Sequence, residues 1–92
     1  MITGVAIRWG HFMIALPRPA RHNDVLRVAH ERAMAEPGSE FATVWERGRS
    51  GRPQGFIDKR GRFLTREEAA EVALQAGQIT VATDRLYSED IW

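Results

Sequence analysis

The segment QGFIDKRGRFLTREEAAEVALQAGQ, residues 54–78, predicts a β-hairpin that runs directly into an α-helix. Asp58 and Gly61 stand at the first and fourth positions of a type I turn, where these residue types are favoured. The turn joins the short runs 55–57 and 62–64, which we expect to pair as antiparallel strands. The hairpin therefore brings two strands together immediately before the helix begins.

The predicted helix begins with the T-x-x-E pattern of a capping box, formed by Thr65 and Glu68. Each side chain is expected to accept a hydrogen bond from the backbone N–H of the other residue. Leu64 and Ala69 flank the box at the positions of a hydrophobic staple. Gly77 suits the left-handed conformation that ends a helix. Small apolar residues recur along one face of this helix at Ala69, Val72, Ala73 and Ala76.

The N-terminal half predicts a second hairpin followed by a second helix. Residues 2–9 and 12–16 show the apolar alternation that is typical of strands, with Gly10 between them. Residues 21–35 carry apolar side chains at helical spacing, and Asn23 or Asp24 could cap the start of this helix. Pro37 and Gly38 would close it.

Three further segments complete the chain. Phe41, Thr43 and Trp45 alternate with smaller residues and predict a third strand at 41–45. Residues 46–53, ERGRSGRP, predict an arginine-rich loop beside the second hairpin, where a ligand-responsive segment is expected. The tail has no helical period, and a short strand is expected from Ile79, Val81 and Leu86.

Together these elements predict an α+β fold, a small antiparallel sheet from two hairpins packed with two helices, in one domain covering residues 1–92. A chain of this length buries only roughly 60–65 % of the surface that its unfolded form exposes. The C-terminal Trp92 also needs burial, either in its own core or in a neighbouring subunit, since free termini are usually polar. We therefore expect a homodimer or a higher homo-oligomer.

The charge of the chain is balanced overall but unevenly distributed. The formal net charge is +1, yet seven basic residues lie within twenty positions, at Arg47, Arg49, Arg52, Lys59, Arg60, Arg62 and Arg66. Arginine binds phosphate through two parallel hydrogen bonds. The cluster indicates either a solvated surface or a local anion site. A long nucleic-acid track is not expected, because such domains carry a clear positive excess.

Several kinds of chemistry and location are disfavoured. The chain has no cysteine, no apolar run long enough to span a membrane and no signal peptide pattern, so we expect a soluble cytoplasmic protein. His22 and His30 are eight residues apart, too far for one ion, and His11 lies on another element, so no metal is expected. No nucleophile motif, paired carboxylates or glycine-rich phosphate loop occurs, so we expect no enzyme and no cofactor.

Two clusters remain as candidate ligand-binding residues. Arg62 and Arg66 lie beside the free N–H groups at the start of the second helix, although Arg66 could instead pair with neighbouring glutamates. Phe56 is the candidate stacking surface for a base, because Gly55 and the arginine loop flank it. Arg21, His22 and Asn23 offer donors at the first helix, or serve only as cap and surface.

Three blocks of the sequence resemble a pattern found in small phage proteins. They are RHND at 21–24, QGFxxxxGRFxxREEAxxxAxxAGQ across 54–78, and LYSEDIW at 86–92. In this respect the chain resembles the anti-Thoeris family, which sequesters the cyclic ADP-ribose immune signals of the host. The chain is shorter than these relatives between Gln78 and Leu86.

The resemblance implies a non-enzymatic sponge in the host cytoplasm that binds glycocyclic ADP-ribose without cleaving it, in pockets at a subunit interface. Some members of the family are similar in also binding cyclic oligonucleotides. The ligand-binding residues that it implies here are Arg21, His22, Asn23, Phe56, Arg62 and Arg66. The alternatives are an inhibitor that blocks a host defence factor by direct protein contact, as anti-CRISPR proteins do, and a nucleotide hydrolase.

Overall fold

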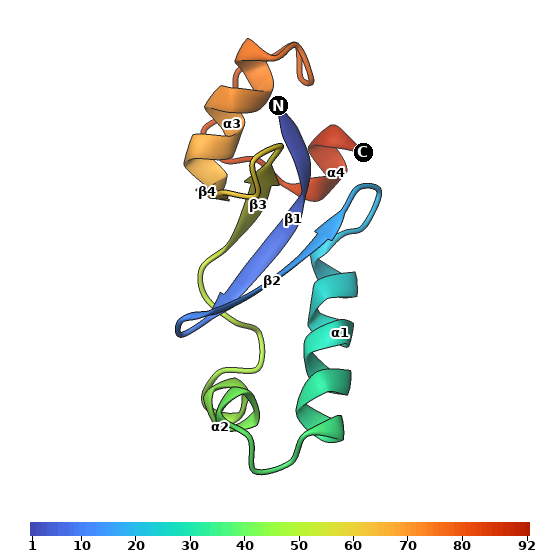
Figure 1. Ribbon diagram of the computed structural model, residues 1–92. Coiled ribbons are helices and arrows are strands. Elements are labelled where there is room, and N and C mark those ends of the chain that lie inside the picture. The colour runs from blue at the N-terminus through green and yellow to red at the C-terminus, as the bar shows by residue number, and fades with distance from the viewer.

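The computed structural model describes residues 1–92. In chain order its elements are β1 (Ile2–Trp9), β2 (Phe12–Pro17), α1 (His22–Ala35), α2 (Glu40–Arg47), β3 (Gln54–Asp58), β4 (Phe63–Thr65), α3 (Arg66–Gln75) and α4 (Ser88–Ile91). The molecule is longer than it is wide, with extents of 45 × 21 × 20 Å. Figure 1 shows α1 and α2 at one end and α3 and α4 at the other, with the sheet between them.

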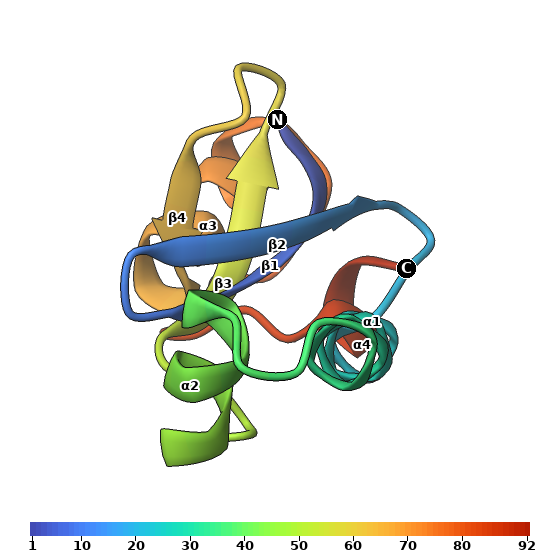
Figure 2. The same cartoon turned by 60° about the horizontal axis from the view of Figure 1, so that its bottom comes forward.

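The four strands form one antiparallel sheet in the order β2-β1-β3-β4. The hairpin of β1 and β2 joins the hairpin of β3 and β4 through the pairing of β1 with β3. Figure 2 shows the strong twist of the sheet from β2 to β4. The predicted α+β class and the predicted sheet of two hairpins are confirmed.

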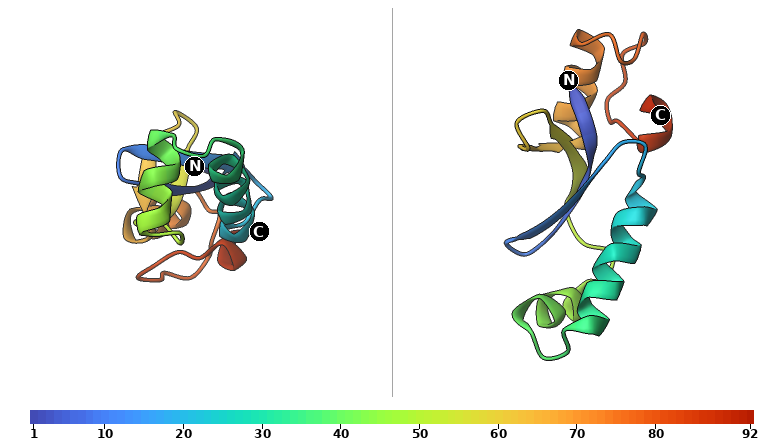
Figure 3. Two further views of the ribbon diagram at one scale, coloured as in Figure 1. Left: turned by 90° about the horizontal axis from the view of Figure 1, so that it is seen from below. Right: turned by 45° about the vertical axis from the view of Figure 1, so that its right-hand side comes forward.

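One face of the sheet forms the core of the protein. Val5, Ile7 and Trp9 of β1 are buried, and the residues directly opposite them on β2 are Leu16, Ile14 and Phe12. Phe56 of β3 lies opposite Val5 and is fully buried. Because directly opposed residues share a face, these side chains form one apolar layer of the core. Figure 3 shows α1 and α2 together at one end of the molecule, next to the hairpin of β1 and β2.

The other face of the sheet is only partly covered, and Phe63 provides most of that cover near β3. The hydrogen-bonding register places Ala6, Gly55 and Phe63 on this face, and Arg8 lies 5.6 Å from the centre of the Phe63 ring. A Cβ atom on Gly55 would come within 2.8 Å of the Phe63 ring and within 2.1 Å of the Leu64 carbonyl oxygen. A residue without a side chain is therefore required at position 55.

The hairpin and capping motifs around α3 are confirmed. The Gly61 N–H donates to the Asp58 carbonyl at 2.9 Å and closes the turn between β3 and β4. The Thr65 hydroxyl accepts from the Glu68 N–H at 3.1 Å, and the Glu68 carboxylate accepts from the Thr65 N–H at 2.9 Å. Gly77 has a φ of 71°, as expected for a helix end.

The predicted apolar stripe of α3 is confirmed except at its last residue. Ala69 and Ala73 are buried, and Val72 packs against the core while partly buried, whereas Ala76 is exposed. The helix ends at Gln75, and the chain turns so that the Gln78 side chain bonds both the N–H and the carbonyl of Ile2. Gln78 thus serves as a backbone-like partner for the start of β1, and Ala76 is left on the outside.

The predicted strand at 41–45 is wrong, because this segment forms α2. Phe41 and Trp45 are four residues apart and both buried, so their spacing fits a helix face as well as a strand face. Ser39 decides between them, since its side chain accepts from the Ala42 N–H at 3.1 Å and caps the helix. The structure therefore has α2 and the short α4 in addition to the two predicted helices.

The predicted strand in the tail is also wrong. Residues 76–87 contain no strand, and Val81 is 76 % exposed. Leu86 enters the core with no exposed surface, and Ile79 packs against the core while partly buried. The Asp90 carboxylate accepts from the Tyr87 N–H at 2.9 Å, which starts α4 where an extended segment was expected.

The terminal indole is accommodated within its own chain. Trp92 packs against the edge of Phe56, and its Nε1 donates to the Ala20 carbonyl at 2.9 Å. Arg21 also donates to the Trp92 carbonyl. The expected homo-oligomer therefore stays a prediction. No helix of the structure combines the length and apolar character needed to cross a membrane.

Replacing Gly55 with Ala is expected to destabilise the protein by about 3 kcal/mol, because the added Cβ collides with the backbone of β4. Urea unfolding followed by circular dichroism measures the effect. The matched control is Gly48→Ala, since no atom lies within 4 Å of a Cβ there and the backbone is extended at φ −165°. The control is expected to change stability by less than about 0.5 kcal/mol. Equal effects of the two substitutions would contradict the packing argument.

Candidate functional site

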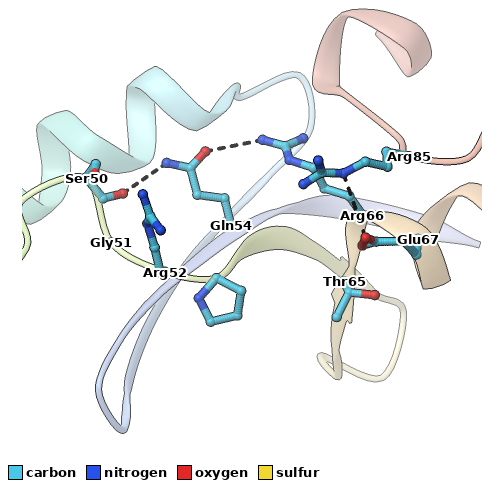
Figure 4. Close-up of a pocket in the computed structure, with 9 residues that line it drawn as sticks. Ser50, Gly51, Arg52, Gln54, Thr65, Arg66, Glu67 and Arg85 are labelled. Atoms are coloured by element: carbon cyan, nitrogen blue, oxygen red, sulfur yellow. Dashed lines mark hydrogen bonds and ion pairs between the residues drawn. The ribbon is translucent and has the colours of Figure 1, made fainter.

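The largest hollow in the structure is a polar cleft of about 660 Å³ between the loop before β3 and the start of α3. We call it the arginine cleft. Its nine lining residues include no hydrophobic side chain and carry three arginines, Arg52, Arg66 and Arg85, against one acid, Glu67. Three positive charges against one negative charge leave a formal excess of two. Figure 4 shows these side chains arranged around the opening.

Arg66 is the most firmly held of the three arginines. Its guanidinium donates to the Leu86 carbonyl at 2.8 Å and to the Gln54 side chain at 3.2 Å, and it lies 4.5 Å from the centre of the Tyr87 ring. Gln54 in turn donates to the Ser50 carbonyl at 2.9 Å (Figure 4). Burial lowers the pKa of Arg66 below its ordinary value, but an arginine remains protonated near neutral pH.

The start of α3 contributes backbone donors to the arginine cleft. The capping box satisfies the N–H groups of Thr65 and Glu68. By helix geometry the N–H groups of Arg66 and Glu67, the first two helical residues, have no acceptor within the helix. Both residues line the cleft, so a bound anion could use these donors together with the arginines. Glu67 is partly neutralised by Arg85 at 3.7 Å.

A smaller cavity of about 170 Å³ lies on the other side of Arg66. Residues 21–23 line it from the start of α1, and Tyr87, Ser88 and Glu89 line it from the start of α4. Arg66 lines both this cavity and the arginine cleft. Segments that are far apart in the sequence therefore meet on either side of one guanidinium.

His22 holds the wall of the small cavity to the sheet. Its Nε2 lies 2.7 Å from the Gly55 carbonyl oxygen, which can only accept, so Nε2 carries the proton. Burial is the main reason why the pKa of His22 lies below its ordinary value of 6.5, and Arg66 lowers the pKa further. At neutral pH the imidazole is therefore uncharged, and Nδ1 is left as an acceptor.

The structure brings together four of the six residues singled out in the sequence. Arg21, His22, Asn23 and Arg66 all line the small cavity. Phe56 lies elsewhere, with no exposed surface and its ring against His22 and Trp92 in the core, so it presents no free face to a base.

Arg62 also lies away from both hollows. It donates to the carboxylate of Asp58 at 2.8 Å, at the turn between β3 and β4. Backbone and side-chain hydrogen bonds from Arg62, together with one from the Arg60 N–H, lower the pKa of Asp58. This arginine therefore stabilises the charged carboxylate that organises the turn.

Four residues of the site were not among the predicted binding residues. They are Gln54, Arg52, Arg85 and Tyr87. An indication of Arg52 as a site residue was present in the sequence, because it lies in the loop predicted to respond to a ligand. Arg85 is the one base among the acids of the tail after Arg66, which is a weaker signal. Gln54 is the first residue of the second sequence block, but only the folded chain places it between Ser50 and Arg66.

The fold and these hollows define a small α+β protein with a polar cleft lined by arginines. A comparison with protein families matches residues 1–92 to the family described as phage T4 y16D protein. The chain belongs to that family and is a small phage protein. Comparison with curated proteins gave no match. Comparison with solved structures also gave none.

The lowered pKa of His22 predicts a pH dependence of stability. Well above pH 6.5, at about pH 7.5, the imidazole is neutral in both folded and unfolded chains. Below that pH the unfolded chain binds a proton more readily, so the free energy of unfolding is expected to fall as the pH falls. Asp58 contributes in a separate window, because its pKa is lowered from an ordinary value of 3.8. Urea unfolding at a series of pH values between 7.5 and about 5 measures the slope.

The His22→Gln variant is the direct check on this assignment. A Gln amide can donate to the Gly55 carbonyl but does not titrate, so the slope between pH 6.5 and 5 should diminish. The matched control is His30→Gln, whose side chain lies on the exposed side of α1. If the His22 variant keeps the full slope, another group is responsible.

Proposed function

We propose that this protein binds and sequesters a cyclic, nucleotide-derived immune signal without cleaving it, in a phage counter-defence role. The signals of leading interest are the glycocyclic ADP-ribose molecules, followed by cyclic oligonucleotides. Membership of a phage protein family supports the phage context. The resemblance of the three sequence blocks to the anti-Thoeris family supports the choice of ligand.

The observation that carries the proposal is the meeting of all three blocks at Arg66. His22 from the first block, Arg66 from the second and Tyr87 from the third line one cavity. The second block also supplies Gln54 to the adjoining arginine cleft. Residues that only stabilise a fold do not need to gather around polar hollows. Their convergence here is what a shared ligand would require.

The size and charge of the arginine cleft suit such a ligand. Pockets for small molecules are typically about 300–1,000 Å³, a range that includes the volume of 660 Å³. A pyrophosphate carries two negative charges, which match the formal excess of two in the cleft. Arg52 and Arg85 are exposed and could bind phosphate through two hydrogen bonds each, while Arg66 is already oriented by Leu86 and Gln54.

Sequestration also requires tight binding, because the ligand must be withdrawn from a host sensor. A nanomolar dissociation constant corresponds to about −12 kcal/mol. A preformed site helps to reach this value, because side chains that are already held in place lose little further entropy on binding. The chain of hydrogen bonds from Ser50 through Gln54 to Arg66 is such a preformed support.

Calorimetric titration with cyclic ADP-ribose isomers and with cyclic di- and trinucleotides tests the proposal. We expect saturable binding of at least one of these ligands, and recovery of the intact ligand by mass analysis after heat denaturation. Conversion of the ligand would instead establish a hydrolase. Absence of heat with all of them would refute sequestration of this class of signal.

Substitutions distinguish binding in the arginine cleft from attraction of the ligand by the overall charge of the protein. Arg85→Ala and Arg52→Ala should each weaken binding by about tenfold or more, since each removes charged hydrogen bonds to phosphate. Arg60→Ala is the matched control, because Arg60 is exposed at the turn between β3 and β4 and lines no hollow. If Arg60→Ala weakens binding as much as the cleft variants do, long-range charge rather than the cleft is responsible.

A groove between α1 and α2 favours inhibition by protein contact as the second candidate function. It has a volume of about 520 Å³, and four of its nine lining residues are hydrophobic. Met34 on its rim is 56 % exposed. A stoichiometric complex with a host defence factor that is lost in a Met34→Glu variant but kept in Arg85→Ala would support this alternative.

A further inference from the structure

Two buried polar side chains in the wall of the small cavity have an atom without a hydrogen-bond partner. His22 is 8 % exposed, and its Nε2 is bonded to the Gly55 carbonyl, which leaves Nδ1 as an unpaired acceptor. Ser88 is 5 % exposed, and its carbonyl accepts from the Trp92 N–H at 3.1 Å, whereas its hydroxyl makes no hydrogen bond in the structure. Polar groups at buried positions are almost always paired, so these two indicate a partner from outside the chain.

Both unpaired atoms can be reached from the cavity. Among residues that are not exposed, Trp9 Nε1 is the only side-chain nitrogen or oxygen that is both enclosed and unpaired. The small part of His22 and Ser88 that stays accessible therefore includes Nδ1 and Oγ, and both residues line the small cavity. A group that enters the cavity can contact these two atoms.

The charged residues of the small cavity add donors and a second acceptor. Arg21 and Arg66 line it as cations, and Glu89 lines it as an anion. Burial lowers the pKa of both His22 and Arg66, and the negative charge of Glu89 acts in the opposite direction on each pKa. The Glu89 carboxylate is therefore within electrostatic reach of both groups. The cavity thus offers acceptors, donors and a hydroxyl that can serve as either.

This mixture of groups suits hydroxyls better than it suits a phosphate or a base. A phosphate mainly accepts hydrogen bonds, so it would meet two further acceptors here. A base needs a free aromatic face, but Arg66 already lies 4.5 Å from the centre of the Tyr87 ring. The volume of about 170 Å³ also falls below the roughly 300–1,000 Å³ that is typical for a whole small molecule, so the cavity suits one part of a ligand.

We propose that the small cavity holds two neighbouring hydroxyl groups of a ribose, while the phosphates of the same ligand lie in the arginine cleft. His22 Nδ1 and the Glu89 carboxylate accept from the two hydroxyls, and the Ser88 hydroxyl and Arg66 donate to their oxygens. An acidic side chain binds ribose in the same way in dinucleotide-binding folds. Arg66 lines both hollows and so lies between sugar and phosphate. This assignment rests on the proposed function and adds which part of the ligand each hollow binds.

The test follows the ring nitrogens of ¹⁵N-histidine-labelled protein by NMR at about pH 7.5, where His22 is neutral. The signals that disappear in His22→Gln identify His22. The probes are the cyclic ADP-ribose isomers, ADP and inorganic pyrophosphate, each added at constant ionic strength. We expect the Nδ1 signal of His22 to move upfield and to saturate with a ribose-bearing probe, because a nitrogen that gains a donor is shielded. Pyrophosphate has no sugar and should leave this signal in place.

The other outcomes separate the sugar subsite from the proposed function. An equal movement with pyrophosphate overturns the subsite, because the shift is then transmitted from the arginine cleft. A His22 signal that stays in place while calorimetry detects binding of a ribose-bearing probe also overturns the subsite, but it leaves the proposed function standing. Absence of both movement and heat with every probe refutes the two together.

The contact with a hydroxyl is checked with the 2′-deoxy form of the probe that moves the signal. This form lacks one hydroxyl and should bind about tenfold more weakly. Glu89→Gln removes a charged acceptor and should reduce this preference. The matched control is Glu71→Gln, which should keep the preference, because Glu71 is exposed on α3 and lines no hollow. Equal affinities of the two forms for the unaltered protein would overturn the proposal.

Discussion

The pairing of Arg66 with Leu86 holds together the half of the protein that contains the candidate site. The two residues exchange two hydrogen bonds, since Leu86 N–H donates to the Arg66 carbonyl at 3.0 Å and the Arg66 guanidinium donates to the Leu86 carbonyl at 2.8 Å. Leu86 is fully buried. This link fixes the segment after α3, which has no regular structure until α4, at a point between the bonds of Gln78 to Ile2 and the start of α4. The small cavity would then lose the wall that Tyr87 and Ser88 provide.

The same link explains why a charged side chain lies partly buried at this place. A guanidinium that leaves water must be compensated by acceptors, and here Leu86, Gln54 and the face of Tyr87 supply them. These acceptors occupy only some of the five N–H donors of the group. Arg66 lines two hollows, so a residue that stabilises the fold also brings positive charge to both of them.

Local interactions account for the parts of the structure that could be predicted from the sequence. The turn at Asp58 and the capping box at Thr65 depend on partners within four residues, so the residue types alone specify them. The prediction of a strand at 41–45 failed because the spacing of Phe41 and Trp45 fits both a strand and a helix. The helix cap at Ser39, which decides between them, was not recognised. The prediction for the tail failed because Leu86 and Ile79 pack against the core as individual side chains, without pairing as a strand.

In the candidate site, too, the residues held by local interactions were predictable and those brought in by tertiary packing were not. Arg66 was recognisable because it begins a capped helix, and the residues of the first helix start were recognisable as a group of donors. Phe56 was chosen for its arginine-rich neighbours, but register places its ring on the core face opposite Val5. Gln54 and Arg85 join the cleft only through tertiary packing, which no spacing in the sequence reveals.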